Sequence, residues 1–338
     1  MNNVLFNNLS LKIKENYGIN VESYELIHNE LSVIYKVYTS QKNYILKIMN
    51  KKINEKTILK EVSVTNFLRA KGFAVSKYVQ CLNDKYYLYF NNRIVVMQEY
   101  IEGETKEKNT GDKKQLLDSA KYLGMIVDAL EDYPYDDMKK YNINIDEKNY
   151  YLDKSKQKFE EIIKLAESNK KYGELIISDL KEKQNMLNKF LLGNDFTGIE
   201  KVSIKKTHGD YTIRQFIYDG DDIKAIIDFV NAAELPITWE IIRSYSYIDK
   251  ECVNGIFNID NLVEYTKEYM KYSSLNKYDL KYMPYIYLAQ LLNSTFGYVQ
   301  YLYTGNLSLL QFGIERTNTC RYLINNYKQI SEELQKLI

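Results

Sequence analysis

The hydrophobic pattern of this chain changes once, near residue 103, and that change constrains its fold more than any other feature. Before it, short apolar or alternating segments between polar turns predict strands at 24–27, 33–38 and 44–48. Helical spacing follows over 58–68, with Gly72 placed to end the helix, and 86–90 and 94–100 predict a hairpin around two asparagines. Beyond residue 114 helical spacing dominates, so the chain must combine a sheet-rich part with a helical part.

This order predicts an α+β fold of two lobes. Residues 1–103 form a β-rich N-terminal lobe and residues 104–338 a mainly helical C-terminal lobe, joined by the polar stretch 104–114. We expect 114–192 to be almost wholly helical and further helices to run to the C-terminus. A chain of 338 residues is long enough to bury a core in each lobe.

Composition excludes several classes of partner and compartment. The formal net charge of +1 gives no field that favours nucleic acid or an acidic membrane. No apolar run approaches the ~20 residues of a membrane span, and the first 18 residues predict an amphipathic helix, not a signal peptide. Three widely spaced cysteines indicate reduced thiols and no zinc motif. We therefore expect a cytoplasmic monomer or homodimer without nucleic-acid or membrane partners.

The chemistry is concentrated in residues 207–233. Asp210 lies in a His-Gly-Asp turn directly after a strand-like run, and Asp228 ends the apolar run of residues 225–227. Between them, Gln215 begins a hairpin whose turn is 220–222, so two carboxylates and an amide meet at one end of a ribbon. Phosphoryl transfer needs such a set: one carboxylate for the acceptor hydroxyl, and a carboxylate with an amide for Mg²⁺.

This stretch resembles the catalytic and metal-binding loops of the aminoglycoside phosphotransferase and choline kinase-like superfamily, a branch of the protein-kinase-like fold. That pattern is His-Gly-Asp, an Asn five residues after the Asp, and then Ile-Asp-Phe. The chain matches it except that Gln215 replaces the Asn, as in maltokinase-like members. The resemblance implies that Asp210 is the catalytic base, and that Gln215 and Asp228 hold Mg²⁺, since an amide carbonyl is also an oxygen donor.

The resemblance also implies how the nucleotide phosphates are held. Lys47, in the third strand, corresponds to the lysine that contacts the phosphates. Glu61 matches the glutamate of the following helix, which forms an ion pair with that lysine. The loop 28–32 contains no glycine, so Ser32 and backbone amides are left to cover the phosphates.

The stretch 98–103 resembles the hinge that binds adenine in this family. Gln98 then occupies the gatekeeper position, and backbone groups of Glu99 and Ile101 bond the base. Anchoring the hinge on Met97 instead shifts this register by one residue. The alternative is an ordinary edge strand that ends at a glycine turn.

Four further features have both a structural and a functional interpretation. The resemblance makes His208 structural, a residue that holds the catalytic loop. It makes Glu240 a brace of that loop, and the i,i+3 spacing allows Glu240 to pair with Arg243. Arg214 either reaches phosphate or substrate, or lies on the surface. The tyrosines of the C-terminal helices either line an acceptor pocket or form the core.

The resemblance predicts an ATP-dependent phosphotransferase, with GTP left open, that uses Mg²⁺ and acts on a hydroxyl of a small molecule. An aminoglycoside, a sugar or an amino alcohol would fit. The alternative is a non-catalytic kinase-fold binding or scaffold protein, as in spore-coat relatives. The glycine-free loop and Gln215 favour that alternative, whereas Lys47, Asp210 and Asp228 together argue against it. A protein kinase is disfavoured because no Ala-Pro-Glu segment follows Asp228.

Overall fold

The computed structural model describes residues 3–29 and 32–338, and its N-terminal part is an antiparallel sheet flanked by two helices. The sheet has five strands in the order β1-β2-β3-β5-β4. Its elements are α1 (Asn3–Tyr17), β1 (Ser23–Asn29), β2 (Val33–Tyr38), β3 (Tyr44–Ile48), α2 (Glu55–Ala70), β4 (Leu88–Phe90) and β5 (Arg93–Glu99). The predicted strands, the N-terminal helix and the helix after the third strand are confirmed.

Local sequence explains where these elements turn. Asn91 and Asn92 form the two-residue loop of the β4–β5 hairpin with φ of 50° and 58°, a conformation that asparagine tolerates better than most residues. The side chain of Asn54 caps the first turn of α2 by accepting from the Thr57 amide. Gly72 follows the end of α2 with φ of 91°, as its predicted role requires.

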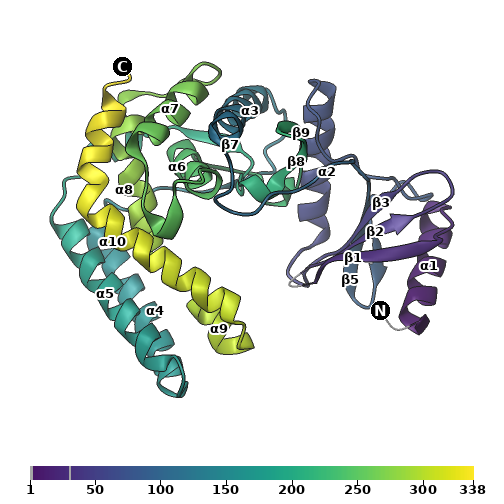
Figure 1. Cartoon of the computed structure of the whole chain (residues 1–338), viewed down its shortest axis with the longest axis horizontal. Coiled ribbons are helices and arrows are strands. Elements are labelled where there is room, and N and C mark those ends of the chain that lie inside the picture. The colour runs from purple at the N-terminus through teal and green to yellow at the C-terminus, as the bar shows by residue number, and fades with distance from the viewer. Residues whose placement is uncertain (1–2, 30–31) are drawn as a thin grey trace.

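The C-terminal part is mainly helical and carries two small sheets (Figure 1). Its helices are α3 (Lys113–Glu131), α4 (Lys148–Glu167), α5 (Gly173–Leu192), α6 (Ile237–Ile248), α7 (Ile259–Met270), α8 (Lys277–Asn293), α9 (Tyr298–Thr304) and α10 (Leu307–Gln335), with short 3₁₀ turns η1 (Ile199–Lys201), η2 (Ile213–Gln215), η3 (Phe229–Asn231) and η4 (Val253–Gly255). One sheet has the order β6-β10-β7, from β6 (Lys139–Lys140), β7 (Ile204–Thr207) and β10 (Ala233–Pro236). The other is the ribbon of β8 (Phe216–Asp219) and β9 (Asp222–Ile226).

The expectation that 114–192 is almost wholly helical is wrong in two places. Residues 132–147 leave the helical conformation, and two of them form β6. Pro134 accounts for the break, because proline lacks an amide and disfavours the helical conformation in the residue before it. A second interruption separates α4 from α5, where the Asn169 side chain accepts hydrogen bonds from the amides of Lys171 and Tyr172.

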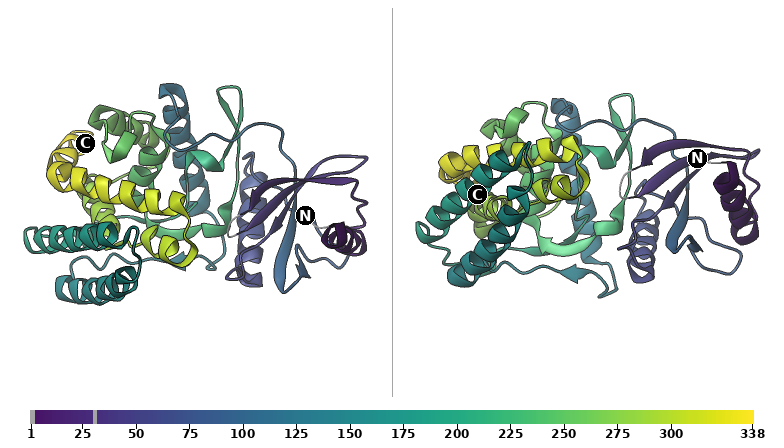
Figure 2. Two further views of the ribbon diagram at one scale, coloured as in Figure 1. Left: turned by 60° about the horizontal axis from the view of Figure 1, so that its bottom comes forward. Right: turned by 90° about the horizontal axis from the view of Figure 1, so that it is seen from below.

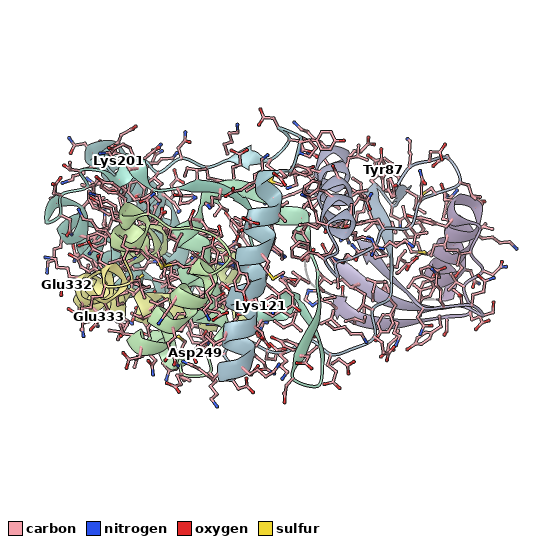
Figure 3. All side chains as sticks on the ribbon, turned by 90° about the horizontal axis from the view of Figure 1, so that it is seen from above. Tyr87, Lys121, Lys201, Asp249, Glu332 and Glu333 are labelled. Atoms are coloured by element: carbon pink, nitrogen blue, oxygen red, sulfur yellow. The ribbon has the colours of Figure 1, made fainter. Side chains whose placement is uncertain are left out.

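The described residues form four hydrophobic clusters, and the largest includes residues of both parts. One core lies within the N-terminal sheet and against α1, and a larger one fills the helical part and reaches the buried face of α2. Helices α4, α5 and α10 lie together at the end far from the sheet (Figure 2). Seen with all side chains, α3 with Lys121 runs between the helical half and the half that contains Tyr87 (Figure 3). Within the described ranges, no helix is both long and apolar enough to cross a membrane.

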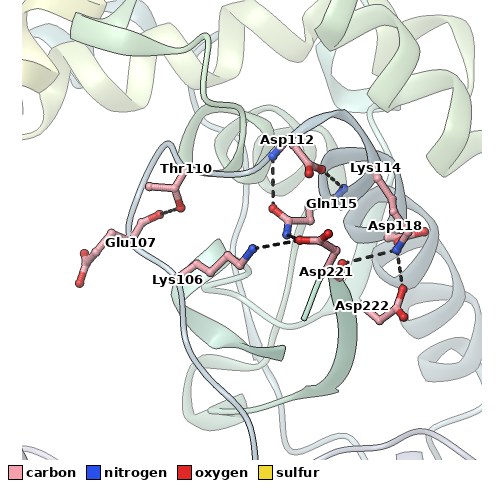
Figure 4. Close-up of polar contacts among 9 residues, drawn as sticks. All are labelled: Lys106, Glu107, Thr110, Asp112, Lys114, Gln115, Asp118, Asp221 and Asp222. Carbon is pink, nitrogen blue, oxygen red and sulfur yellow. Dashed lines mark hydrogen bonds and ion pairs between the residues drawn. The ribbon is translucent and has the colours of Figure 1, made fainter. Parts of the chain in front are cut away.

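The segment after β5 ties the sheet to the ribbon. Gly103 has φ of 145°, and a Cβ there would lie 2.4 Å from the Tyr218 carbonyl, so only glycine fits. Glu104 and Tyr218 exchange backbone hydrogen bonds of 3.0 and 2.8 Å. At the turn of the same ribbon, Asp221 accepts from Gln115 of α3 and lies 3.8 Å from Lys106 (Figure 4). The turn end of the ribbon is therefore fixed to the segment after β5 and to α3.

Candidate active site

The loop between β7 and β8 carries the His-Gly-Asp turn and is held by one buried carboxylate. Glu240, fully buried on α6, accepts from the Thr207 hydroxyl at 2.5 Å and from the amides of Gly209 and Tyr211, both at 3.0 Å. Gly209 has φ of 81°, and a Cβ there would lie 2.0 Å from the Asn231 carbonyl oxygen. The predicted brace by Glu240 is therefore present.

His208 is structural, as the resemblance implies. Its ring is fully buried against Phe229, with 4.4 Å between ring centroids. Nδ1 accepts from the Asp210 amide at 3.3 Å, so Nε2 carries the proton and donates to the Ile227 carbonyl at 2.9 Å. The ring thus links the His-Gly-Asp loop to the end of the ribbon.

Asp210 forms an ion pair that the sequence did not predict. Arg243 Nη2 lies 2.5 Å from Asp210 Oδ1, and the side chain of Asp210 remains 31% exposed. The guanidinium also lies over the rings of Trp239 and Tyr247, at 5.3 and 4.8 Å from their centroids. The predicted pairing of Arg243 with Glu240 is therefore wrong, because α6 turns Glu240 under the loop and Arg243 toward the carboxylate.

Asp228 sits at the far end of the ribbon in a strained backbone conformation. Its φ and ψ of 69° and 56° are left-handed, which is uncommon for a residue other than glycine and concentrates at functional sites. Lys47 Nζ on β3 lies 3.3 Å from Asp228 Oδ1. Burial opposes the charged form of Asp228, but the Lys47 ammonium and the nearby His208 together outweigh it and lower the pKa of this carboxyl.

Glu61 shares this environment without pairing to Lys47. Its side chain is fully buried on α2, and neither carboxylate oxygen has a hydrogen-bond partner among the described residues. Burial raises the pKa of Glu61 from its usual 4.5 to about 7, against the opposing charge of Lys47. The predicted Lys47–Glu61 pair is thus replaced by a Lys47–Asp228 pair across the two lobes.

Gln215 and Asp228 fit the donor set of a magnesium site. The backbone carbonyl of Gln215 accepts from the Ile227 amide at 2.9 Å, which places Gln215 beside Asp228. A carboxylate and an amide oxygen are the hard ligands that Mg²⁺ takes, and Mg²⁺ in kinases binds few protein groups because the phosphates supply others. Among the described residues, no group of three His, Cys, Asp or Glu could hold a metal ion, so a site here would need the nucleotide.

Two residues of the predicted hinge, Glu99 and Ile101, differ in whether their backbone groups form hydrogen bonds within the protein. Gln98 is buried, with an amide nitrogen that has no partner among the described residues. The Glu99 amide donates to the Lys77 carbonyl at 2.9 Å. Any hydrogen bond between Glu99 and adenine would therefore use the Glu99 backbone carbonyl. Ile101 makes no hydrogen bond to another described backbone group. The backbone of Ile101 is therefore open to a base.

Ser32 and Arg214, two further residues that the sequence singled out, each contact another part of the protein. Ser32 accepts from the Asn50 amide at 3.1 Å, which joins its loop to the end of β3; residues 30–31 of that loop lie outside the described residues. Arg214 is 60% exposed and pairs with Glu107 at 2.6 Å. Of its two interpretations, the surface role agrees with this position.

A pocket of about 400 Å³ opens beside Gly209. It is lined largely by apolar side chains from three regions: Tyr141, Ile143, Ile145 and Tyr151, then Leu235, Pro236 and Trp239, then Ile286, Ala289 and Gln290. Nothing in the sequence singled out 141–145, because the pairing of β6 with β10 that brings it here is non-local. Most tyrosines of the C-terminal helices are instead buried in the core, and Tyr303 is exposed.

The comparisons with known proteins agree with this geometry. The family model described as the phosphotransferase enzyme family matches residues 24–254, more than half of the chain, and the chain belongs to this family. The predicted superfamily, the α+β kinase-like fold and the enzyme class are confirmed. No curated protein matches the sequence.

Solved structures of the same fold cover nearly the whole chain. An amicoumacin kinase in complex with AMP-PNP, Ca²⁺ and Ami has a TM-score of 0.62 at 14% identity, over 97% of each chain. A microcompartment-associated aminopropanol kinase has a TM-score of 0.63 at 15% identity, over 98% of this chain and 100% of its own. A spectinomycin phosphotransferase with ADP and spectinomycin has 0.59 at 14% identity, over 98% of both. At these identities the likeness shows the fold.

Proposed function

We propose that this protein transfers the γ-phosphate of ATP to a hydroxyl of a small molecule, with Asp210 as the catalytic residue. The observation that carries the proposal is the arrangement of two aspartates around one ribbon. Asp210 is partly exposed on a loop braced by Glu240, and Asp228 is set in a left-handed conformation beside Lys47. This is the division of labour that phosphoryl transfer requires.

In the reaction, Asp210 orients the acceptor hydroxyl and takes its proton. The hydroxyl oxygen forms a bond to the γ-phosphorus as the bond to the β–γ bridging oxygen breaks, and ADP leaves. Transfer of this kind has a loose transition state, so orientation dominates and Asp210 needs no raised pKa. Lys47 leaves Asp228 to contact the phosphates, and Glu61 then becomes its carboxylate partner.

Mg²⁺ would be held by Asp228 and Gln215, where it would neutralise charge on the phosphates. The adenine would lie against Gln98 and bond the backbone at Glu99 and Ile101, with Ser32 in the loop over the phosphates. Related structures contain AMP-PNP, ADP or AMP, which supports ATP over GTP. The relatives named above act on antibiotics or on an amino alcohol, which supports a small-molecule acceptor here.

Two further expectations remain part of this proposal. Gly103, where only glycine fits, supports a lobe boundary at 103–104. All three cysteines are buried and unpaired, which supports the reduced thiols of the cytoplasm. The oligomeric state, monomer or homodimer, stays a prediction.

A phosphotransfer screen tests the function directly. Purified protein is incubated with Mg²⁺-ATP and a panel of hydroxyl-bearing metabolites and antibiotics, and Asp210→Asn serves as the matched control. We expect phosphorylation of at least one acceptor, reduced about 10³-fold in Asp210→Asn because the hydroxyl loses its base. Turnover that Asp210→Asn leaves unchanged contradicts the role of Asp210. No phosphotransfer and no thermal shift with Mg²⁺-ATP favour the scaffold alternative.

A further inference from the structure

A second hollow lies beyond Arg243, and its lining is strongly cationic. Lys108 from the connecting segment, Arg243 from α6 and Arg316 from α10 all line it, together with Ser246, Tyr247 and Tyr287. The hollow has a volume of about 440 Å³ when its open mouth is included. Its inner part is much smaller, about 30 Å³. Such a cluster of like charges around a cavity is unfavourable unless something anionic enters it.

The protein itself only partly neutralises these cations. Lys108 pairs with Glu315 at 3.0 Å, and Arg243 pairs with Asp210. Arg316 contacts a neutral group, the side-chain oxygen of Gln290, at 3.2 Å, and no described carboxylate pairs with it. Three cations therefore face two carboxylates, and the surplus charge is positive.

Two arginine donors are also left unsatisfied. Arg243 Nη1 and Arg316 Nε are buried and have no hydrogen-bond partner among the described residues. Buried polar groups in folded proteins are almost always bonded, so an unmet donor on a residue that lines a cavity indicates an absent partner. A guanidinium offers several donors in one plane, which match the two oxygens of a carboxylate.

We propose that the phosphate acceptor carries a carboxylate and that this hollow binds it. This inference rests on the proposed function and adds the substrate class. The inner space has room for about two waters, by the ~10–15 Å³ that one water needs, and a carboxylate suits it better than the bulkier phosphate group. The cationic lining repels an ammonium group, so polycationic aminoglycosides are disfavoured as acceptors.

Arg243 fixes where the carboxylate lies relative to the reacting hydroxyl. One nitrogen of its guanidinium holds Asp210, and the neighbouring nitrogen is unpartnered. A carboxylate bound there lies one guanidinium width from Asp210, so the acceptor is a hydroxy acid whose hydroxyl and carboxylate are close together. Gln290 joins Arg316 to the pocket beside Gly209, which gives the remaining apolar part of the acceptor a place.

The test compares matched acceptors with matched variants. Small hydroxy acids and hydroxy amino acids are assayed with Mg²⁺-ATP beside their primary amides, the corresponding amino alcohols and phosphomonoesters of similar length. Wild type is compared with Arg316→Gln, with Arg316→Lys, and with Lys328→Gln, which removes one exposed positive charge from the same helix α10.

We expect hydroxy acids to exceed their amides at least ~30-fold in kcat/KM. Arg316→Gln should lower this ratio about 10–100-fold through KM, Arg316→Lys should restore part of it, and Lys328→Gln should leave it unchanged. A merely structural role of Arg316 would lower turnover of acid and amide alike, which contradicts the proposal. Nucleotide affinity, measured with ADP, should be the same in all four proteins, and thermal melting verifies that each is folded.

The remaining outcomes separate the inference from the function beneath it. Turnover of amides or amino alcohols at rates equal to the acids overturns the carboxylate site and keeps the kinase. Preference for phosphomonoesters overturns the carboxylate in favour of a phosphate group. No turnover of any acceptor by any of the proteins overturns the proposed function and this inference together.

Discussion

The two ends of the candidate site are built differently. At the phosphate end, Lys47 and Asp228 meet across 181 positions of sequence, one on the N-terminal sheet and the other at the end of the ribbon. At the acceptor end, Asp210, Glu240 and Arg243 all belong to the C-terminal lobe and lie within 33 positions. The first end therefore depends on how the lobes are placed, whereas the second can form within one lobe.

The two ends also differ in how completely their polar groups are hydrogen-bonded. The Asp210 loop is held by three hydrogen bonds to one buried carboxylate, whereas both carboxylate oxygens of Glu61 have no hydrogen-bond partner among the described residues. Lys60 of α2 also reaches across, donating to the Val230 and Ala232 carbonyls at 2.9 and 2.7 Å. We infer that the acceptor end is preformed and that the phosphate end rearranges when nucleotide binds.

The largest effect on stability should come from the brace of the acceptor end. Glu240→Ala leaves two backbone amides and a hydroxyl without an acceptor in the core, and we expect a loss of about 3–5 kcal/mol in the free energy of unfolding. Phosphotransfer should fall with it because the Asp210 loop loses its fixed position. Chemical denaturation and a phosphotransfer assay measure the two effects.

Glu107→Ala is the matched control for that variant. Glu107 is 78% exposed in its pairing with Arg214, and surface pairs contribute little, so a change within about 0.5 kcal/mol is expected. Equal losses in the two variants would show that the acceptor loop does not depend on its buried brace.

A smaller, pH-dependent effect should come from the phosphate end. Glu61 has a pKa of about 7 in the folded protein and an ordinary value of 4.5, so the folded state binds an extra proton between these pH values. Stability should therefore fall as the pH rises from about 4.5 to 7, by up to about 3 kcal/mol. Glu61→Gln should remove this slope, as measured by denaturation at several pH values without nucleotide.

Glu55→Gln controls for the loss of a carboxylate on the same helix. Hydrogen bonds from Tyr87 and Tyr89 lower the pKa of Glu55, so its titration has the opposite sign and cannot produce the same slope. A slope that persists in Glu61→Gln would mean that the buried carboxylate is not the group responsible.

The sequence was sufficient where local patterns decide the structure. The period-2 strands, the two asparagines of the β4–β5 turn and the His-Gly-Asp turn each have a short-range cause, and they lie where predicted. The brace by Glu240 was found through the family resemblance, which carries information on a contact between β7 and α6. No run of residues around Glu240 contains that information by itself.

The rest could not be predicted because it depends on which faces meet in three dimensions. The spacing of Glu240 and Arg243 suggested a pair on one helix. Instead, Glu240 accepts from backbone amides of the His-Gly-Asp loop and Arg243 pairs with Asp210. Lys47 forms its ion pair with Asp228 and not with Glu61 because of how the two lobes are placed. The cationic hollow joins the segment after β5, α6, the segment around η4, α8 and α10, and no sequence window spans all five.

The central claim, that Asp228 serves the nucleotide and Asp210 the acceptor, is tested most directly by calorimetric titration of ADP with and without Mg²⁺ into the wild type, Asp210→Asn and Asp228→Asn. We predict that Asp210→Asn binds Mg²⁺-ADP within about 3-fold of wild type. Asp228→Asn should lose the Mg²⁺-dependent part of affinity, about 10–100-fold, because the charged ligand is gone. Equal losses in both variants, or full Mg²⁺-dependent binding by Asp228→Asn, would contradict that division.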